Sequence, residues 1–483
     1  MRTMHVALLL LLLPTLAWAA DAKPARVNAA DFPNLQAAVD ALPEGGGEVV
    51  LPPGNYVLDK TLDLTGRNTR PRDAKYPHSG DFITLTGSGM LNTTLVGKMK
   101  DQPVVDLTDS TYVTMRDLKI VSDTANIGLL LARETGNGGC NGFFTNVMVD
   151  GSFSVAGVYC LASEVCRWYN CYFIQKAKDG VGFIIAPVNY WKVKSPYHEL
   201  TAGCSNTEFK FYGCTWAAWG GGKCVDLWVC GPSTSDLAIY GGYFSATGLT
   251  GILLDGTHGG GRVGAVSIEG VRIEGERAEH CLLARGLVDN VRVHTGEWVS
   301  GSAEPISYEP GGAGRLWEVS GLGLVIYDGI YVKYAPGADN YRMVRFESPL
   351  RDSKLEILDN YPTLFTKNAK GDFEASYPRG KSVVLEAGGS GNEFTVARRE
   401  DLVVKGEDSG NVVRALEDGG VTRTYQGSGG LPALLNLSPC DVTKLPNPKL
   451  GDLAVDSGIN TADHQPGPMF YDGKKWRALS LTP

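Results

Sequence analysis

Hydrophobic and polar residues alternate in short runs through most of the chain, and the runs end at glycine, asparagine or proline. Alternation with a period of two is typical of β-strands that bury one face. Residues 33–42 differ, because Leu35, Val39 and Leu42 fall on one face at helical spacing after Pro33, which suits a first helical turn. The pattern predicts an all-β chain with one short helix near its beginning.

A five-residue pattern with Asp, Asn or Gly at its head and apolar inward positions recurs along the chain. Its members are residues 117–121, 146–150, 170–174, 213–217, 241–245, 270–274 and 290–294. The steps between them are 29, 24, 43, 28, 29 and 20 residues, which are typical of a solenoid, and the step of 43 predicts an inserted loop. The head residue suits a tight turn with positive φ. Trp216 falls on an inward position.

A second repeated strand lies between members of the first, at residues 157–161, 180–184, 224–228, 251–255 and 281–285. We expect its inward positions to be Val158, Val181, Val225, Ile252 and Leu282. Two strands per coil, each stacked in parallel, predict a parallel β-helix. A β-propeller or a pair of sandwiches is the alternative, but both need antiparallel hairpins, and few Asn-Gly or Asp-Gly turns occur at suitable spacing.

The segment Leu35-Gln-Ala-Ala-Val-Asp-Ala-Leu-Pro-Glu-Gly-Gly-Gly-Glu-Val-Val-Leu-Pro-Pro-Gly-Asn-Tyr56 resembles the start of the pectate-lyase superfamily, the rhamnogalacturonase- and epimerase-like right-handed parallel β-helices. In that family the short helix plugs the open N-terminal end of the coil. The resemblance implies this fold and a carbohydrate-active protein. The reaction stays open, because the chain has neither the Asp-Asp pair of polygalacturonases nor the Trp-Ile-Asp-His string of classical pectate lyases.

The chain divides into four expected parts. Arg2, the apolar run Leu8–Leu13 and the small-x-small site Ala17-Trp18-Ala19 predict a cleaved signal peptide over residues 1–19. The apolar run is too short for a membrane anchor, which is the alternative. We therefore expect a secreted, periplasmic or cell-surface protein with no membrane span. The other parts are a β-helix domain over 24–425, a Gly/Pro-rich linker over 426–450 and a C-terminal β-hairpin tail over 451–483.

Composition and charge narrow the partners. The net charge of −8 disfavours a nucleic-acid partner. The ten cysteines lack zinc-site spacing, and in an exported chain we expect one or two disulfides, with the other thiols as small core residues. No metal site and no cofactor is evident, and no EF-hand or nonapeptide loop supports calcium.

The first candidate site lies on the outward side of the first repeat. Its alignment places Arg272 beside Arg292 and Glu274 beside His294, with Tyr243 one coil away. Arginine can neutralise the carboxylate of a uronate, and tyrosine or histidine can remove the proton next to it. These are the groups that a polysaccharide lyase needs. The alternative is a solvated surface with weak cross-strand ion pairs.

The second candidate site is the glycine-rich loop that begins at Asp255 and contains His258. A hydrolase would need a second carboxylate across the sugar. The sequence offers four for this role: Asp226, Glu269, Glu274 and Glu276. The alternative is a plain turn with an ion pair between Asp255 and Arg285.

The insertion behind the 43-residue step is rich in aromatic side chains, which stack on the apolar faces of sugars. We expect residues 187–200 to leave the coil and flank a substrate groove. The predicted substrate-binding residues are Tyr190, Trp191, Lys192, Lys194, Trp219 and Trp228. The alternative is a hydrophobic loop that covers the solenoid or makes an oligomer contact.

Together these features favour an exported carbohydrate-active protein, first of all a polysaccharide lyase that acts on a uronate-containing polymer. A glycoside hydrolase or a sugar epimerase on the same fold is an alternative. A non-catalytic glycan-binding, adhesive or tail-spike-like solenoid is another, and either a monomer or a homotrimer fits.

Overall fold

The computed structural model describes most of the chain between residues 25 and 478. The described residues are 25–43, 45–66, 82–133, 141–197, 199–200, 205–231, 234–258, 261–275, 277–300, 304–328, 341–358, 363–367, 370, 372–376, 382–398, 401–409, 411–417, 421–426, 453–456, 467–471 and 474–478. The predicted signal peptide and residues 427–450 of the predicted linker lie outside them.

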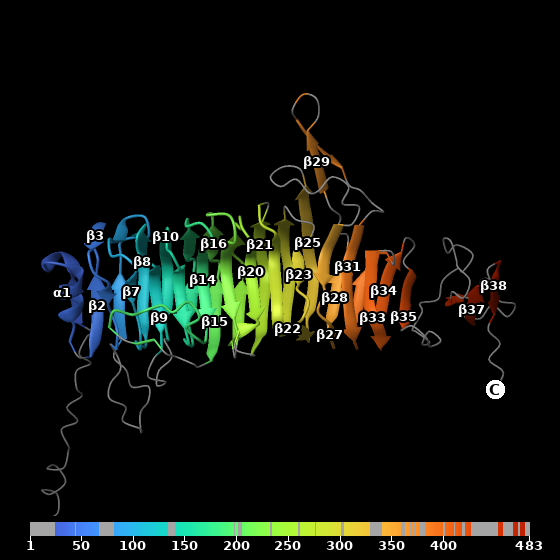
Figure 1. The fold of residues 1–483 in the computed structure, drawn as a ribbon, viewed down its shortest axis with the longest axis horizontal. Coiled ribbons are helices and arrows are strands. Elements are labelled where there is room, and N and C mark those ends of the chain that lie inside the picture. The colour runs from blue at the N-terminus through green and yellow to red at the C-terminus, as the bar shows by residue number, and fades with distance from the viewer. Residues whose placement is uncertain are drawn as a thin grey trace, which may run out of the picture.

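The strands form a parallel β-helix whose coils stack along the long axis of the molecule (Figure 1). One coil consists of β14 (Val181–Ala186), β15 (Asn206–Tyr212) and β16 (Thr215–Ala218). Each strand pairs in parallel with its equivalent in the next coil, namely β17 (Val225–Cys230), β18 (Thr234–Tyr240) and β19 (Tyr243–Phe244). Each coil therefore has three strands, not the expected two. We name the three sheets face A (with β14), face B (with β15) and face C (with β16).

The remaining strands extend these faces in both directions. Face A contains β4 (Leu62–Asp63), β7 (Pro103–Asp106), β9 (Ile127–Ala132), β11 (Ala156–Leu161), β20 (Thr250–Gly256), the start of β22 (His280–Ser300), β23 (Ile306–Tyr308), β26 (Tyr341–Phe346), β31 (Ser382–Ser390) and β33 (Leu402–Ser409). Face B contains β1 (Ala25–Asn28), β2 (Gly46–Val50), β5 (Phe82–Thr86), the first halves of β8 (Val113–Ser122), β10 (Phe143–Gly151) and β21 (Arg262–Gly275), β12 (Arg167–Tyr169), the middle of β22, β24 (Ala313–Arg315), the start of β25 (Glu318–Asp328), β27 (Leu350–Arg351), β28 (Lys354–Ile357), β32 (Glu393–Val396) and β34 (Val412–Glu417).

The third sheet, face C, and a few antiparallel strands make up the rest of the structure. Face C contains β3 (Gly54–Leu58), β6 (Thr93–Gly97), β13 (Tyr172–Gln175) and the last parts of β8, β10, β21, β22 and β25. The end of β25 pairs with β29 (Thr363–Lys367), which forms an antiparallel hairpin with β30 (Phe373–Ser376). The strand β35 (Val421–Gln426) pairs antiparallel with β34. A separate antiparallel sheet contains β36 (Leu453–Asp456), β37 (Gly467–Tyr471) and β38 (Trp476–Ala478).

A 3-10 helix, η1 (Ala29–Asp31), and the helix α1 (Leu35–Asp40) precede the second strand. The side chain of Asn34 caps α1 by accepting a hydrogen bond from the backbone N–H of Ala37 at 2.9 Å. Leu35 and Val39 of α1 are buried in the same core as the strands. Figure 1 shows α1 at the blue end of the stack. The role of this helix as a plug stays a prediction.

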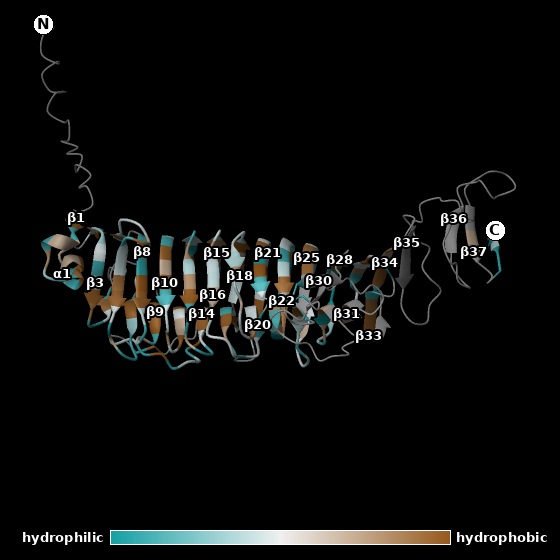
Figure 2. Cartoon of the chain, turned by 90° about the horizontal axis from the view of Figure 1, so that it is seen from above, coloured by the Kyte–Doolittle hydropathy of each residue, from teal (hydrophilic) through white to brown (hydrophobic). Residues whose placement is uncertain are grey.

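The interior of the coil is a continuous apolar core, and strands such as β8 and β10 alternate between buried and partly exposed positions. Figure 2 shows hydrophobic and hydrophilic residues mixed along the strands of the stack. Trp168 stacks on Phe144 and Phe211 within it, while Phe173 and Trp216 meet these rings edge to face. Trp216 is fully buried as expected. Stacked rings bury large apolar area between coils, which supports the regular spacing of the solenoid.

The corner between faces B and C explains the first repeat. Successive coils place Asp117, Asn146, Asn170, Gly213, Gly241, Gly270 and Thr295 there, all with positive φ. The amide of Asn146 donates to Asp117, and the amide of Asn170 donates to Asn146, each at 2.8 Å. These hydrogen bonds satisfy the polar side chains at the corner and connect neighbouring coils.

The last step of the predicted repeat is wrong. Residue 270 is followed on the same corner by Thr295, so the step is 25 residues rather than 20. Asn290 also has positive φ, but it belongs to a different bend, where it follows Ala265. Both bends are followed by the same alternation, and the β-branched Thr295 concealed the true corner because such residues rarely adopt positive φ.

The second repeat is found on face A, but its members at 180–184 and 224–228 are displaced by two residues, because Val158 is in register with Phe183 and Ile252 with Leu227. Val158, Ile252 and Leu282 face the main core as expected. Val181 and Val225 instead belong to a second apolar cluster outside the coil. All six residues of β14 are buried, so alternation could not indicate which side faces inward.

The described cysteines are core residues. Cys160, Cys166, Cys171, Cys214, Cys224, Cys230 and Cys281 are all buried. The expected disulfide is not found within the described part of the chain, and Cys140, Cys204 and Cys440 lie outside it. Burial raises the pKa of the Cys160 thiol well above its usual range, which keeps it neutral.

The predicted C-terminal hairpin is present as β37 and β38, with Tyr471 opposite Trp476. The predicted domain boundaries stay predictions. None of the helices in the described ranges has the length and apolar character needed to cross a bilayer.

Candidate functional site

Residues 187–197 with 199–200 leave the coil after β14 and lie against the outside of face A; we call this segment the strap. Its Val193 and Leu200 are buried in the second apolar cluster, together with Leu130 and Ile184 of the strands. Asn189 holds the strap in shape, because its side-chain amide donates to the carbonyls of Val193 and Leu200 at 2.8 and 3.0 Å. The strap therefore does what the alternative interpretation expected and covers the solenoid.

The strap brings aromatic side chains to the outer surface of face A. Trp191 meets Trp228 edge to face, with ring centroids 5.1 Å apart, and meets Tyr159 at 5.7 Å. The neighbouring Tyr190 donates its hydroxyl hydrogen bond to the carbonyl of Gly231 at 2.9 Å. Tyr190, Trp191 and Trp228, which the sequence nominated separately, thus form one half-buried aromatic wall.

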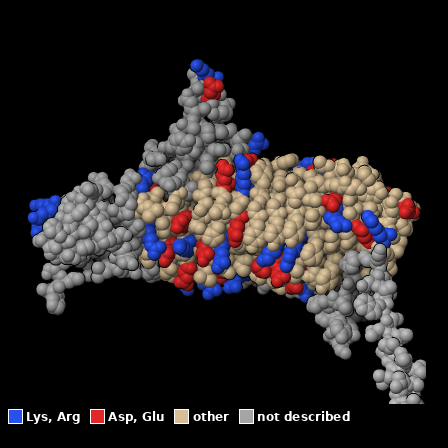
Figure 3. Space-filling view, turned by 180° about the vertical axis from the view of Figure 1, so that it is seen from behind, with Lys and Arg blue, Asp and Glu red and all other residues tan. Residues whose placement is uncertain are grey.

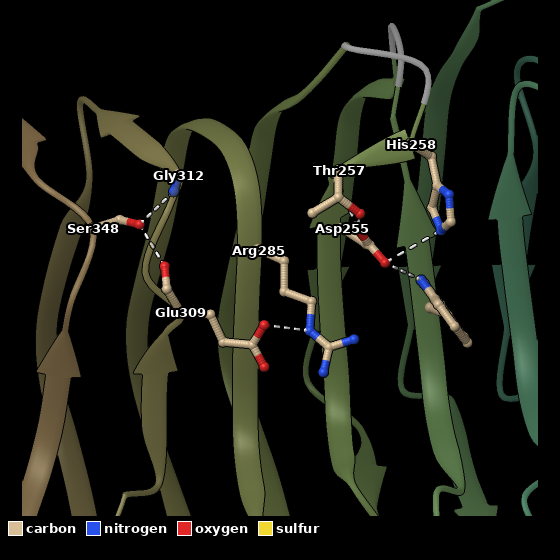
Figure 4. A network of polar contacts seen from close by, with 8 residues as sticks. Asp255, Thr257, His258, Arg285, Glu309, Gly312 and Ser348 are labelled. Carbon is tan, nitrogen blue, oxygen red and sulfur yellow. Dashed lines mark hydrogen bonds and ion pairs between the residues drawn. The ribbon is translucent and has the colours of Figure 1, made fainter.

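Asp255 and His258 lie at the end of this wall, where β20 turns from face A to face B (Figure 4). Nε2 of His258 is 3.5 Å from a carboxylate oxygen of Asp255. The imidazole stacks on the Tyr190 ring, with centroids 4.3 Å apart. The aspartate side chain is 3% exposed and the histidine side chain 35%, so the carboxylate is covered while the imidazole reaches solvent.

The carboxylate of Asp255 is held by three donors besides the imidazole. The backbone N–H and hydroxyl of Thr257 donate to one oxygen at 3.0 and 2.5 Å. The indole N–H of Trp228 donates to the other at 3.3 Å. These donors hold the Asp255 carboxylate in one orientation as a hydrogen-bond acceptor. The carboxylate in turn orients the imidazole of His258.

Polar groups continue along the same corner in the next coils (Figure 4). Arg285 is in register with Asp255, but its guanidinium forms an ion pair with Glu309 at 2.9 Å rather than with Asp255. Ser348 follows, and its hydroxyl accepts a hydrogen bond from the N–H of Gly312 at 2.8 Å. The predicted Asp255–Arg285 pair is therefore wrong as an ion pair, although the two residues are neighbours.

The first candidate site is not assembled as predicted. Arg272 is in register with Glu297, and Arg292 with Ser267 on face B, so the two arginines are not neighbours. Glu274 lies beside Val299 rather than His294. The cause is the register error at Thr295 described above.

Arg272, Glu274 and Tyr243 nevertheless contact one another on face C. Tyr243 donates to Glu274 at 2.5 Å, and Arg272 pairs with Glu274 at 2.6 Å and with Glu297 at 3.9 Å. Burial, together with the hydrogen bond to Glu274, raises the pKa of Tyr243 to about 12, which disfavours this phenol as a base near neutral pH. Arg272 is thus paired with two carboxylates, which agrees with the alternative interpretation of a surface with cross-strand ion pairs.

Arg292 and His294 point from face B instead. Arg292 pairs with Glu318 at 3.2 Å, and His294 lies 3.7 Å from the same carboxylate. Nδ1 of His294 also contacts the hydroxyl of Ser320 at 2.8 Å. These residues form a surface network apart from Arg272.

The remaining predicted binding residues are placed as follows. Trp219 is 52% exposed on the face C side, and its indole N–H donates to Ser245 at 3.3 Å. Lys192 and Lys194 are exposed on the strap. Of the proposed second carboxylates, Asp226 is fully buried, Glu269 and Glu274 lie on other faces, and Glu276 lies outside the described residues. No hydrolase pair forms with Asp255 among those that are described.

Neither metal-binding groups nor surface charge indicate a further site on the described part of the chain. Among the described residues, no group of three or more His, Cys, Asp or Glu side chains could hold a metal ion. Figure 3 shows acidic and basic side chains interspersed over the face in view, without a large region of one sign.

Sequence reasoning missed Glu309 and Thr257 as members of the corner. Thr257 was visible as the third residue of the Asp255 loop, but its hydrogen bonds depend on the turn. Glu309 follows Tyr308, whose pairing with Ala284 places the next residue beside Arg285. No repeated motif marks it, because β23 contains only three residues.

No protein-family model matches the chain, and neither does any curated protein. Solved structures that are similar include an alginate lyase from Paenibacillus sp. str. FPU-7, at 14% identity and a TM-score of 0.42 over 62% of this chain and 95% of that chain. Tailspike protein 3 of bacteriophage CBA120 is 13% identical, with a TM-score of 0.44 over 94% and 68%. The A-module of the Azotobacter vinelandii mannuronan C-5 epimerase AlgE4 is 13% identical, with a TM-score of 0.35 over 80% and 97%. These values are too low to assign a family.

Proposed function

We propose that the protein is an exported carbohydrate-active enzyme that cleaves a uronate-containing polysaccharide by elimination at the corner formed by Asp255, His258 and Arg285. One observation carries this proposal: a covered carboxylate orients a solvent-reaching imidazole, an arginine lies one coil away, and an aromatic wall borders both. A base, a cation for the uronate carboxylate and a surface for sugar rings are thereby close together.

His258 is the proposed base and Asp255 its positioning residue. With Nε2 directed at Asp255, the free ring nitrogen is Nδ1, which has no hydrogen-bond partner among the described residues. The carboxylate itself is unsuited to attack a sugar, because it is covered and its oxygens already accept four contacts. This arrangement favours proton abstraction over a double displacement by Asp255.

The proposed step is a β-elimination. Nδ1 of His258 takes the proton from the carbon next to the uronate carboxylate, and the electron pair forms a carbon–carbon double bond as the adjacent glycosidic C–O bond breaks. The imidazolium then gives its proton to the leaving oxygen. Arg285 stabilises the negative charge that develops on the carboxylate, for which it exchanges its ion pair with Glu309.

A second candidate function is glycan binding without turnover. Trp219 favours it, because its half-exposed indole offers a flat apolar face on which a sugar ring can stack. This surface lies apart from the Asp255 corner. A binding-only protein would hold a polymer through Trp219 and release no product.

The test is a panel of uronate-containing and neutral polysaccharides, followed in parallel by absorbance at ~235 nm for unsaturated uronate and by a reducing-end assay. We expect absorbance and reducing ends to rise together on one uronate polymer. Reducing ends without absorbance would indicate a hydrolase, and binding without either signal would indicate the second candidate. His258→Asn should abolish the absorbance signal, while Lys210→Ala, on face B and paired with Asp236, serves as the control.

A further inference from the structure

A groove of about 700 Å³ lies at the corner between faces A and B, in the coils that follow Arg285. It is formed by the middle of β22, by β24 and β27, and by the turn in β31. Its charged lining residues are Asp289, Arg315, Glu347 and Arg351. The proposed elimination site and the groove share one corner, because Leu287 of the groove follows Arg285 by two residues.

The two arginines of the groove are stacked neighbours. Arg315 is in register with Arg351 of the next coil, at the strand spacing of ~4.8 Å. Like charges directly opposite each other destabilise a sheet, and an anion bound between them removes that repulsion. The sequence predicted such a pair of adjacent arginines at Arg272 and Arg292, and the structure has one at Arg315 and Arg351 instead.

The acidic residues of the groove are held by other partners. Asp289 pairs with Arg262 at 3.3 Å, and Arg315 reaches it only at 4.0 Å. Glu347 forms an ion pair with Arg345 of face A. Arg351 has no acidic partner within the ranges that the structure describes. The groove therefore presents Arg315 beside Asp289 at 4.0 Å, and Arg351 without an acidic partner in the described ranges.

The rest of the lining suits a sugar ring. The side chain of Leu287 is 44% exposed there, and Pro349 is exposed beside it. An apolar surface next to a paired cation matches the chemistry of a uronate, which has an apolar C–H face and a carboxylate on one edge.

We propose that this groove is a uronate-binding subsite, in which Arg315 and Arg351 together bind a carboxylate of the polymer whose cleavage occurs at His258. The choice of ligand rests on the proposed function, but binding here does not require turnover. Guanidinium groups bind carboxylates through paired N–H donors, so lysine is a poor replacement at both positions.

The experiment is isothermal titration with hexamers of galacturonate, guluronate, mannuronate and glucuronate, and with a neutral glucose hexamer. Arg315→Ala and Arg351→Ala should each weaken binding of the preferred uronate hexamer by about tenfold. Arg351→Lys should recover little of that loss. Arg26→Ala, which removes an exposed arginine at the other end of the coil, is the control and should bind as the unaltered protein does.

The outcomes separate this proposal from the proposed function. Unchanged uronate binding in Arg315→Ala and Arg351→Ala, with melting temperatures unchanged, overturns the subsite. An equal loss of neutral-hexamer binding also overturns it, because the groove would then recognise no carboxylate. If the arginine variants lose uronate binding and no polymer gives product at ~235 nm, the subsite stands and the elimination fails.

Discussion

The hydroxyl of Ser195 donates a 2.5 Å hydrogen bond to the carboxylate of Asp106, a residue 89 positions earlier in the chain. Asp106 is fully buried, and its other oxygen accepts from the N–H and hydroxyl of Thr108. Close by, Tyr197 donates to the carbonyl of Thr61 at 3.0 Å. The strap is thus fastened to the first coils, and it carries Tyr190 and Trp191 at its other end.

Ser195→Ala should loosen the strap. The variant leaves a buried carboxylate short of one donor, which costs about 1–3 kcal/mol. We expect a lower free energy of unfolding and faster proteolysis within residues 187–200, followed by mass spectrometry. Ser320→Ala, which removes a hydroxyl that contacts His294 on face B, is the control. Equal proteolysis of Ser195→Ala and the unaltered protein would show that the strap is held by its apolar contacts alone.

Asp226 should make stability depend on pH. It is fully buried, one oxygen accepts the N–H of Ala218 at 2.6 Å, and the other has no partner in the described structure. Burial raises its pKa from 3.8 to about 7, against a smaller lowering by the Ala218 hydrogen bond. The folded state then holds a proton that the unfolded state releases, so stability falls as pH rises from about 4 to 7 and is level above that.

The measurement is chemical unfolding from pH 4 to 8 for the unaltered protein and Asp226→Asn. The contribution of this carboxyl over that range is at most about 4 kcal/mol, from the size of the shift. Asp226→Asn should flatten the decline, whereas Asp236→Asn, at an exposed residue paired with Lys210, should not. Parallel curves for all three proteins would contradict the assignment.

Truncation of the neighbouring tryptophans Trp216 and Trp219 should change the free energy of unfolding by very different amounts. Trp216 is fully buried and stacks on Phe244 with centroids 4.3 Å apart, so Trp216→Ala should cost about 3–5 kcal/mol. Trp219 is 52% exposed, and Trp219→Ala should change stability by less than about 0.5 kcal/mol. Thermal unfolding measures both. A large loss from Trp219→Ala would assign that residue to packing and remove the reason for a glycan surface there.

The sequence was sufficient to predict the parallel solenoid, because alternation and positive-φ corner residues are local signals that repeat. Asn146, Asn170 and Gly213 mark one corner plainly. The third strand of each coil was missed because its own bend has no repeated marker, since Glu208, Asp236, Ala265 and Asn290 adopt positive φ there. Glutamate and alanine carry no strong turn signal, so the bend was not recognised and Asn290 was assigned to the first corner.

The candidate site was predicted in its parts and not in its assembly. Asp255, His258, Tyr190, Trp191 and Trp228 were all nominated, but their contacts depend on how far the strap extends across face A. The arginine pair at Arg315 and Arg351 was invisible, because β27 contains only two residues and no repeat connects it to β24. Register between coils of unequal length is a tertiary property, and a single misaligned corner moves every outward residue.

The central claim is that elimination occurs at the corner of Asp255 and His258. The most direct test compares Asp255→Asn with Arg272→Ala by the initial rate of absorbance increase at ~235 nm on the cleaved polymer. Asp255 orients His258, so Asp255→Asn should lower kcat by at least about a hundredfold while the melting temperature shows a folded protein. Arg272 is held by Glu274 and Glu297 on another face, so Arg272→Ala should keep full activity. Loss of activity in Arg272→Ala with activity retained in Asp255→Asn would place the chemistry on face C and contradict the account.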